Sequence, residues 1–233
     1  MKLVRMLANL GYGSRRDVED LLRDGLVQGP GGKVLGPKDA DPGDPIHIEG
    51  EPMDPRPPLT LVLHKPLGHV CSFSRDEGPI VHDLLPPRFE FRRPALSSVG
   101  RLDKDTTGLL LMTDDGQLLH RLTSPKHAVP KVYRATLDRP LRGDEAGILA
   151  RGGLMLEGDT RPLAPARLEV LEGGQARLTV TEGRYHLVRR AFAALGNHVL
   201  DLHRESVGPL ALDGLALGAW RLLRPEELAL LQA

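Results

Sequence analysis

The hydrophobic residues of the first 24 positions recur at intervals of three and four, a spacing typical of helices that bury one face. The Gly11–Gly13 segment interrupts this pattern, and Ser14 is placed to be the N-cap of a second helix. Residues 26–50 are rich in Gly, Pro and Asp and carry short β-prone pieces around Val34 and Ile46. The buried faces are predicted to be Leu3, Met6, Leu7 and Leu10 in the first helix and Val18, Leu21 and Leu22 in the second.

Residues 51–58, EPMDPRPP, are too rich in proline for a helix or a central strand. We therefore interpret them as a linker that separates a domain at residues 1–50 from a domain at residues 59–233. In the second domain, helices and strands mix without a regular βαβ alternation, which predicts an α+β fold. The predicted strands are 59–64, 109–112, 131–137, 199–202 and 210–212, with a hairpin in 166–181 that turns at Gly173–Gly174; the predicted helices begin at 116, 186 and 225.

Composition narrows the class of protein. The chain of 233 residues is 40% hydrophobic, enough for a folded core, and its formal net charge of zero argues against nucleic-acid binding through bulk charge. A net charge of zero still allows local patches of basic residues on the surface. The single Cys71 excludes intrachain disulfides and fits a reducing compartment, and the nine histidines lack metal-ligand spacing. Without a signal-peptide pattern or a long apolar run, we expect a soluble, cytoplasmic protein that uses no metal.

The stretch GRLDKDTTGLLLMTDDG, Gly100–Gly116, places Asp103 in a polar loop directly before an apolar strand. Backbone amides and hydroxyls from the surrounding glycines and threonines keep such a carboxylate ionised and oriented. An oriented carboxylate can act as a nucleophile or a base without a cofactor. Taken alone, the loop is more typical of a structural Asx turn.

Basic side chains gather on the two N-terminal helices, and arginines at a helix start are well placed to bind phosphate. Acidic neighbours such as Asp17 also allow a simply solvated helix. The run LANLGYGSRRDVEDLLRDGLV, followed by PGDPIHIEG, resembles an S4 RNA-binding domain and covers nearly all of residues 1–50. It departs from that pattern at Gln28–Val34 and at Val4–Arg5. The candidate RNA contacts of this module are Lys2, Arg5, Arg15, Arg16 and Arg23.

Four segments of the second domain, in order, resemble pseudouridine synthases of the branch that includes RsuA and the Rlu enzymes. They are LVLHKPLG (61–68), the Asp103 stretch, SPKHAVPKVYRATL (124–137) and EGRYHLVRRAFAALGNHVLDLHRESVGPLAL (182–212). The resemblance implies a catalytic domain with a mixed, largely antiparallel sheet and flanking helices, and neither a metal nor an organic cofactor. It departs from the family at Leu187, where glutamine is usual.

The resemblance also implies roles for individual residues. Asp103 is the essential catalytic aspartate, Tyr133 stacks on the target base, and Arg189 is the basic partner of the aspartate. Three routes for the aspartate remain open: attack on the ribose, attack on the uracil, or removal of a C2′ proton. Without the resemblance, Tyr133 is more typical of a packed residue in a strand, and Arg189 is more typical of a charged residue on the surface of a helix. The remaining candidate RNA contacts are Lys65, Arg101 and Arg190.

The predicted function is isomerisation of a uridine in ribosomal RNA, or in a ribosomal assembly intermediate, by a monomer. Small-subunit RNA is favoured over large-subunit RNA, because the chain ends soon after the last helix and LLLMTDDGQ resembles the small-subunit type. Two other classes fit part of the sequence. Asp103–Thr107 matches the D-x-D-x-T signature of Mg²⁺-dependent phosphatases, although SSVGRL before it makes a poor strand. A non-catalytic S4 RNA-binding protein would explain only the N-terminal module.

Overall fold

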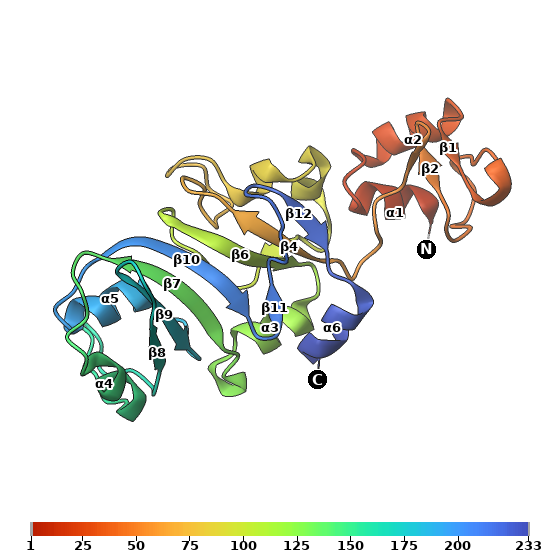
Figure 1. The fold of residues 1–233 in the computed structure, drawn as a ribbon. Helices are drawn as coiled ribbons and strands as arrows, with labels where there is room; N and C mark the ends of the chain where they lie inside the picture. Colours follow the sequence, from red (N-terminus) through yellow and green to blue (C-terminus); the bar gives the residue numbers. More distant parts are fainter. Residues whose placement is uncertain (1, 233) are drawn as a thin grey trace.

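The computed structural model describes residues 2–232 and begins with a small unit of two helices and three short strands (Figure 1). The helices are α1 (Leu3–Asn9) and α2 (Arg15–Arg23), and the strands are β1 (Val27–Gln28), β2 (His47–Ile48) and β3 (Glu51–Pro52). The two predicted helices are confirmed, and Ser14 caps α2 in a reciprocal pair with Asp17. The unit has its own hydrophobic cluster, built from the predicted faces of both helices with Val27, Leu35, Ile46 and Ile48.

The predicted linker is corrected at its start, because β3 pairs with β2 in the sheet of this unit. Pro52 is tolerated there because β3 is an edge strand, where a missing N–H breaks no ladder bond. The connecting segment is therefore 53–58, and it is held on both sides. The backbone N–H of Asp54 donates to the Tyr12 hydroxyl at 2.8 Å, and the Asp54 carboxylate pairs with Arg88.

The rest of the chain is built on one mixed sheet, whose main path runs β12-β4-β6-β10-β7-β9-β8. β6 and β10 are parallel and the other pairings are antiparallel, which confirms the prediction of a mixed, largely antiparallel sheet. The strands are β4 (Thr60–Lys65), β5 (Ser97–Ser98), β6 (Thr106–Thr113), β7 (Lys131–Leu137), β8 (Arg167–Val170), β9 (Gln175–Val180), β10 (Val199–Val207), β11 (Leu210–Ala211) and β12 (Trp220–Leu222).

Helices lie beside the sheet near both of its ends (Figure 1). They are α3 (Gly116–Thr123), α4 (Glu145–Arg151), α5 (Leu187–Ala194) and α6 (Pro225–Gln232). α3, α5 and α6 were predicted, whereas α4 and β12 were not. The central strands β4 and β6 are apolar on both faces because separate hydrophobic clusters cover each: Leu110 and Met112 pack on one side, and Leu109 and Leu111 pack with α3 and α6 on the other. Within residues 2–232, no helix is long and apolar enough to cross a membrane.

Gly108 permits the close approach of β6 and β10 that places the Asp103 loop. Its φ of 115° lies in the left-handed region, and an added Cβ would sit 2.3 Å from the carbonyl oxygen of Arg204. The backbone of β10 therefore leaves no room for a side chain at this position. Two sequence-distant segments, the Asp103 loop and the strand that carries Arg204, are brought together here.

Gly108→Ala is expected to lower the free energy of unfolding by roughly 2–4 kcal/mol, because it adds both backbone strain and a steric clash with β10. Gly116→Ala is the matched control, since an added Cβ there meets nothing within 4 Å. Urea unfolding of both variants measures the difference. Equal stability of the two variants would contradict the close packing of β6 on β10.

Candidate active site

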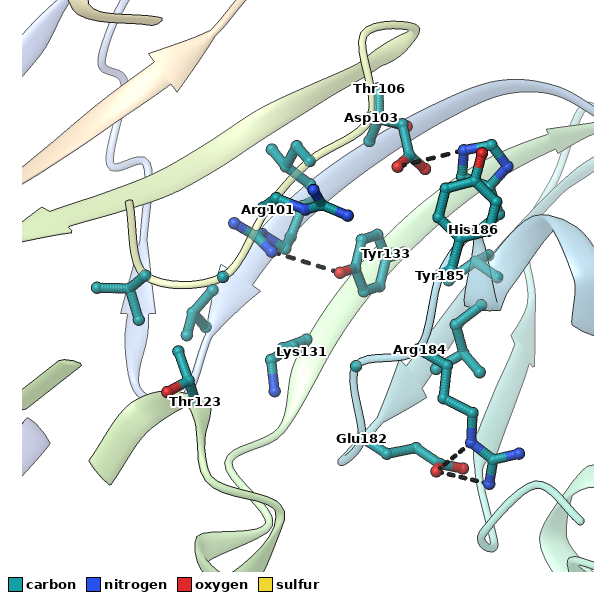
Figure 2. A pocket seen from close by; sticks show the side chains of 18 of the residues that line it. Arg101, Asp103, Thr106, Thr123, Lys131, Tyr133, Glu182, Arg184, Tyr185 and His186 are labelled. Carbon is teal, nitrogen blue, oxygen red and sulfur yellow. Dashed lines mark hydrogen bonds and ion pairs between the residues drawn. The ribbon is translucent and has the colours of Figure 1, made fainter. Parts of the chain in front are cut away.

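A cavity of about 290 Å³ opens beside the Asp103 loop, where β6, β7 and β10 meet the segment before α5 (Figure 2). Asp103 lines it from the loop, Tyr133 from β7 and Arg204 from β10. The segment before α5 contributes Tyr185 and His186. Two of the predicted catalytic residues, Asp103 and Tyr133, therefore share one cavity although 30 positions separate them in the chain.

The ammonium group of Lys65 holds the backbone of the Asp103 loop. Nζ of Lys65 donates to the carbonyl oxygens of Asp103 at 3.0 Å and Thr106 at 2.8 Å, and also reaches those of Pro66 and Lys104. The backbone N–H of Thr106 closes the turn on the Asp103 carbonyl at 3.0 Å. These bonds hold the backbone of the loop, and the Asp103 carboxylate points toward His186 (Figure 2).

Lys65 was predicted to contact RNA, and the structure corrects this. Lys65 is the last residue of β4, lies beneath the loop and has an exposed fraction of 0%. Its ammonium group donates to backbone carbonyls of the loop. Burial lowers the pKa of Lys65, while the nearby charge of Asp103 raises it again. The residue acts on the loop from inside the protein and has no surface to offer a ligand.

Tyr133 lies opposite a buried arginine that the sequence analysis did not select. Tyr133 and Arg204 are cross-strand partners on β7 and β10. Nη1 of Arg204 donates to the Tyr133 hydroxyl at 3.4 Å, the contact drawn as a dashed line in Figure 2, and its guanidinium carbon lies 5.9 Å from the ring centroid. Arg204 is only 2% exposed, and its Nη2 has no hydrogen-bond partner among the described residues. A fixed positive charge therefore lies beside the tyrosine.

The predicted pairing of Arg189 with Asp103 is wrong in this structure. Nη2 of Arg189 lies 2.8 Å from the carboxylate of Asp105, and Nη1 donates to the carbonyl of Val199. Nη2 of Arg189 also donates to the backbone carbonyl of Asp105 at 3.1 Å, so Asp105 and not Asp103 is its acidic partner. Among the residues that the structure describes, Arg189 is not one of those that line the cavity.

His186 takes the place beside Asp103 that was expected for Arg189. Its Nε2 lies 3.5 Å from Oδ1 of Asp103, and its ring stacks on Tyr185 with centroids 3.8 Å apart (Figure 2). His186 is the N-cap of α5 and has a positive φ of 48°, which turns its ring toward the loop. Sequence reasoning missed it because the imidazole and the carboxylate are 83 positions apart; the only local signal was its place directly before a helix.

Arg184 and Glu182 line the cavity and belong to a network of ion pairs that extends away from it. Arg184 pairs with Glu182 and Asp159, both close to 2.9 Å, and Arg190 pairs with Asp159 at 2.9 Å. Arg190 was predicted to bind phosphate, but its guanidinium is engaged here and with backbone carbonyls, because Asp159 lies within its reach. Lys131 also lines the cavity, and burial together with the charge of Arg204 lowers its pKa.

The remaining predicted RNA contacts are exposed and fall into two groups. Arg101 lines the cavity, and Lys2, Arg5, Arg15 and Arg16 lie on α1, on α2 or at their starts; none of the five forms an ion pair with residues 2–232. Arg23 differs, because its guanidinium is paired with Glu19 and Asp20 on its own helix. Arg23 is therefore less available to an RNA phosphate than Arg15 or Arg16.

The alternative of a D-x-D-x-T phosphatase does not fit the topology. Its first aspartate should follow a buried parallel strand, whereas Asp103 precedes β6, and the preceding β5 is a two-residue antiparallel edge piece. Asp105, the second acid of the signature, is held by Arg189. Residues 2–232 contain no group of three side chains placed to hold a metal ion.

Comparison with known proteins decides the family. A family model for RNA pseudouridylate synthase matches residues 59–194. Over 190 residues the chain is 45% identical to the ribosomal small subunit pseudouridine synthase A of Escherichia coli K12, covering 81% of this chain and 80% of that protein. The chain belongs to the RNA pseudouridylate synthase family. It is therefore an isomerase that acts on RNA, as the four ordered motifs predicted.

Other pseudouridine synthases extend the similarity over the whole chain. The ribosomal small subunit pseudouridine synthase A of Vibrio cholerae is 39% identical over 236 residues, covering 98% of each protein. A crystal structure of a pseudouridylate synthase has a TM-score of 0.69 at 36% identity and covers 99% of each chain. The pseudouridine synthase fold of this protein is thus confirmed.

Lys65→Met is expected to reduce the free energy of unfolding by about 2–4 kcal/mol, since it leaves several buried carbonyls without a donor. It is also expected to lower turnover, because the loop that presents Asp103 loses its support. Unfolding and turnover are measured on the same preparation, with the exposed Lys38→Met as control. A Lys65→Met enzyme with the stability and turnover of the control would refute the supporting role.

Proposed function

We propose that this pseudouridine synthase converts one uridine of small-subunit ribosomal RNA to pseudouridine. The proposal is supported by the names of its relatives in Escherichia coli and Vibrio cholerae, which are both small-subunit enzymes. The cavity is of a size to receive one extruded base, and Arg101, which lines it, forms no ion pair with residues 2–232. The substrate is the free RNA or an assembly intermediate of the subunit.

Asp103 is proposed as the catalytic residue of the reaction. The observation that carries this proposal is that its carboxylate and the Tyr133 ring line one cavity. The Asp103 side chain is 30% exposed, so it can meet a base that enters. The guanidinium of Arg204 lies beside the Tyr133 ring and the imidazole of His186 lies beside the Asp103 carboxylate, so polar groups that can orient an entering base flank both residues.

Tyr133 is proposed to receive the target base. Extrusion of a uridine from an RNA helix costs a few kcal/mol, and stacking on an aromatic ring returns about 1–3 kcal/mol. Arg204 fixes the tyrosine hydroxyl and leaves the ring available to the cavity. Arg189 is proposed to position the Asp103 loop rather than to contact the target base. It binds both the carboxylate and the backbone carbonyl of Asp105, near the end of that loop.

Residues 1–50 are proposed to form an S4-like RNA-binding domain, joined by the linker that follows it to the catalytic domain at 59–233. The exposed Arg15 and Arg16 at the start of α2 support this, because helix dipole and side-chain charge both favour an RNA phosphate there. Contacts of Tyr12 and Asn9 with Asp54 and Arg93 restrain the unit against the sheet domain. Such restraint lets one RNA reach both domains in a defined geometry.

Asp103→Asn is expected to abolish turnover while leaving RNA affinity within about threefold, because the substitution removes a charge needed for the chemistry and little contact area. Tritium release from C5-labelled small- and large-subunit transcripts, with and without EDTA, measures turnover. Asp138→Asn, an exposed acid outside the cavity, is the control. Normal release by Asp103→Asn would refute the assignment, and release only from large-subunit RNA would move the substrate to that subunit.

Charge reversal of Arg15 and Arg16 to glutamate is expected to weaken RNA binding and to flatten its salt dependence by about 0.7–0.9 slope units per lost phosphate contact. Acidic residues at a helix start are compatible with the dipole, so α2 should remain folded. The control reverses Arg151 and Arg167, exposed arginines of α4 and β8. A salt slope equal to that of the control would show that the start of α2 does not contact the RNA.

A further inference from the structure

A second cavity, of about 800 Å³, opens on the other side of the Asp103 loop. Its outer wall is the segment from Leu67 to Glu77, which follows β4. Five residues line both cavities, so the loop and the segment before α5 form a thin partition between them. The shared residues are Arg101, Leu102, Asp103, Tyr185 and His186. The proposed reaction fills only the first cavity, which leaves the second without an occupant.

Tyr185 presents an aromatic face at this partition. The chain has only eight aromatic residues of the Phe, Tyr and Trp types, and yet Tyr185 is 67% exposed. One face of its ring is covered by His186 at 3.8 Å, with an angle of 18° between the rings, and His186 is in turn held by Asp103. The ring is therefore fixed rather than freely rotating, and a large part of its surface faces solvent beside the cavities. A fixed, exposed aromatic ring is a stacking platform for a nucleobase.

The charges of the second cavity select which part of a nucleotide can enter. Asp76, Glu77, Asp103 and Asp105 line it. Besides Arg101, the one lysine or arginine in its lining is Lys104, whose ammonium group donates to the carbonyl oxygen of Glu77, so the acids outnumber the cations and a phosphate would be repelled from the interior. Arg101 lies at the junction of the two cavities and forms no ion pair with residues 2–232. A backbone phosphate is therefore favoured at the junction, with a base on either side of it.

We propose that the second cavity binds the nucleobase next to the target uridine, stacked on Tyr185, while the phosphate between the two nucleotides lies at Arg101. The enzyme thus holds a dinucleotide across the Asp103 loop, and the neighbouring base contributes to the choice of the target. This inference rests on the proposed function, because it requires an RNA substrate with a uridine in the first cavity. It assigns a binding role to Tyr185, which the chemistry at Asp103 does not use.

A double-mutant cycle between protein and RNA tests the inference. The RNA is a fragment around the uridine that the wild-type enzyme modifies, made intact or with an abasic ribose immediately before or after that uridine. Dissociation constants are measured with Asp103→Asn as the parent, so that the RNA stays unreacted. Tyr185→Ala, Tyr185→Phe and the control Phe91→Ala are built on this parent; Phe91 is 66% exposed and lines neither cavity.

One of the two abasic fragments should bind the parent roughly 5- to 150-fold more weakly than intact RNA, the range expected for one base–aromatic stack. Tyr185→Ala should weaken binding of intact RNA by a similar factor and then show no further loss with that abasic fragment. Tyr185→Phe keeps the aromatic face and should bind like the parent, as should Phe91→Ala.

Losses from Tyr185→Ala and from the abasic site that simply multiply would overturn the inference, as would unchanged binding by Tyr185→Ala. Failure of the proposed function is distinguishable from both results. In that case the wild-type enzyme releases no tritium from any ribosomal RNA fragment, and no neighbour of a target uridine exists to be bound. Normal tritium release together with multiplying losses refutes the dinucleotide site alone.

Discussion

The active site depends on one buried ammonium group, that of Lys65. Its bonds to the carbonyls of Asp103 and Thr106 tie the Asp103 loop to the end of β4, an internal strand of the sheet. The following strand β6 is then locked against β10 at Gly108, where the two backbones leave no room for a Cβ. The loop is held at both its start and its end, so its backbone is ordered before any RNA arrives. In the reaction proposed for Asp103, this lowers the cost of ordering the carboxylate.

Much of the fold could be predicted from the sequence, because its elements carry their signals locally. The helical period of residues 1–24, the alternation of β7 and the Gly173–Gly174 turn each matched the structure. α4 was not predicted, because its seven residues are short and its buried positions include Glu145, a charged residue that accepts two backbone N–H bonds. β12 was missed because three residues give no measurable period, and only pairing with β4 makes them a strand.

The candidate site could be predicted only in part, because its contacts join residues far apart in the chain. Asp103 and Tyr133 followed from motifs, whereas the partners of each did not. Arg204 had a usable signal: it stands on the buried side of β10, at a position of the kind that Leu202 and Val207 occupy. A charged residue on a core-facing position is costly unless it has a partner, so it marks a site. The motif identified Arg189, but the sequence could not show whether it pairs with Asp103 or Asp105, because both acids belong to the same loop. The structure shows the pair with Asp105.

The balance of charge explains how a neutral chain can bind a polyanion selectively. Many arginines of the sheet domain, such as Arg177 and Arg184, are neutralised by acids of their own neighbourhood. Arg15 and Arg16 at the start of α2 and Arg101 at the junction of the cavities are exposed and form no ion pair within residues 2–232. A net charge of zero gives a modest nonspecific affinity, since that affinity grows with the number of phosphates neutralised. Selectivity must then come from contacts with the bases. The cavity beside Asp103 and the aromatic rings of Tyr133 and Tyr185 can make these contacts only with an RNA whose bases leave the helix at the matching position.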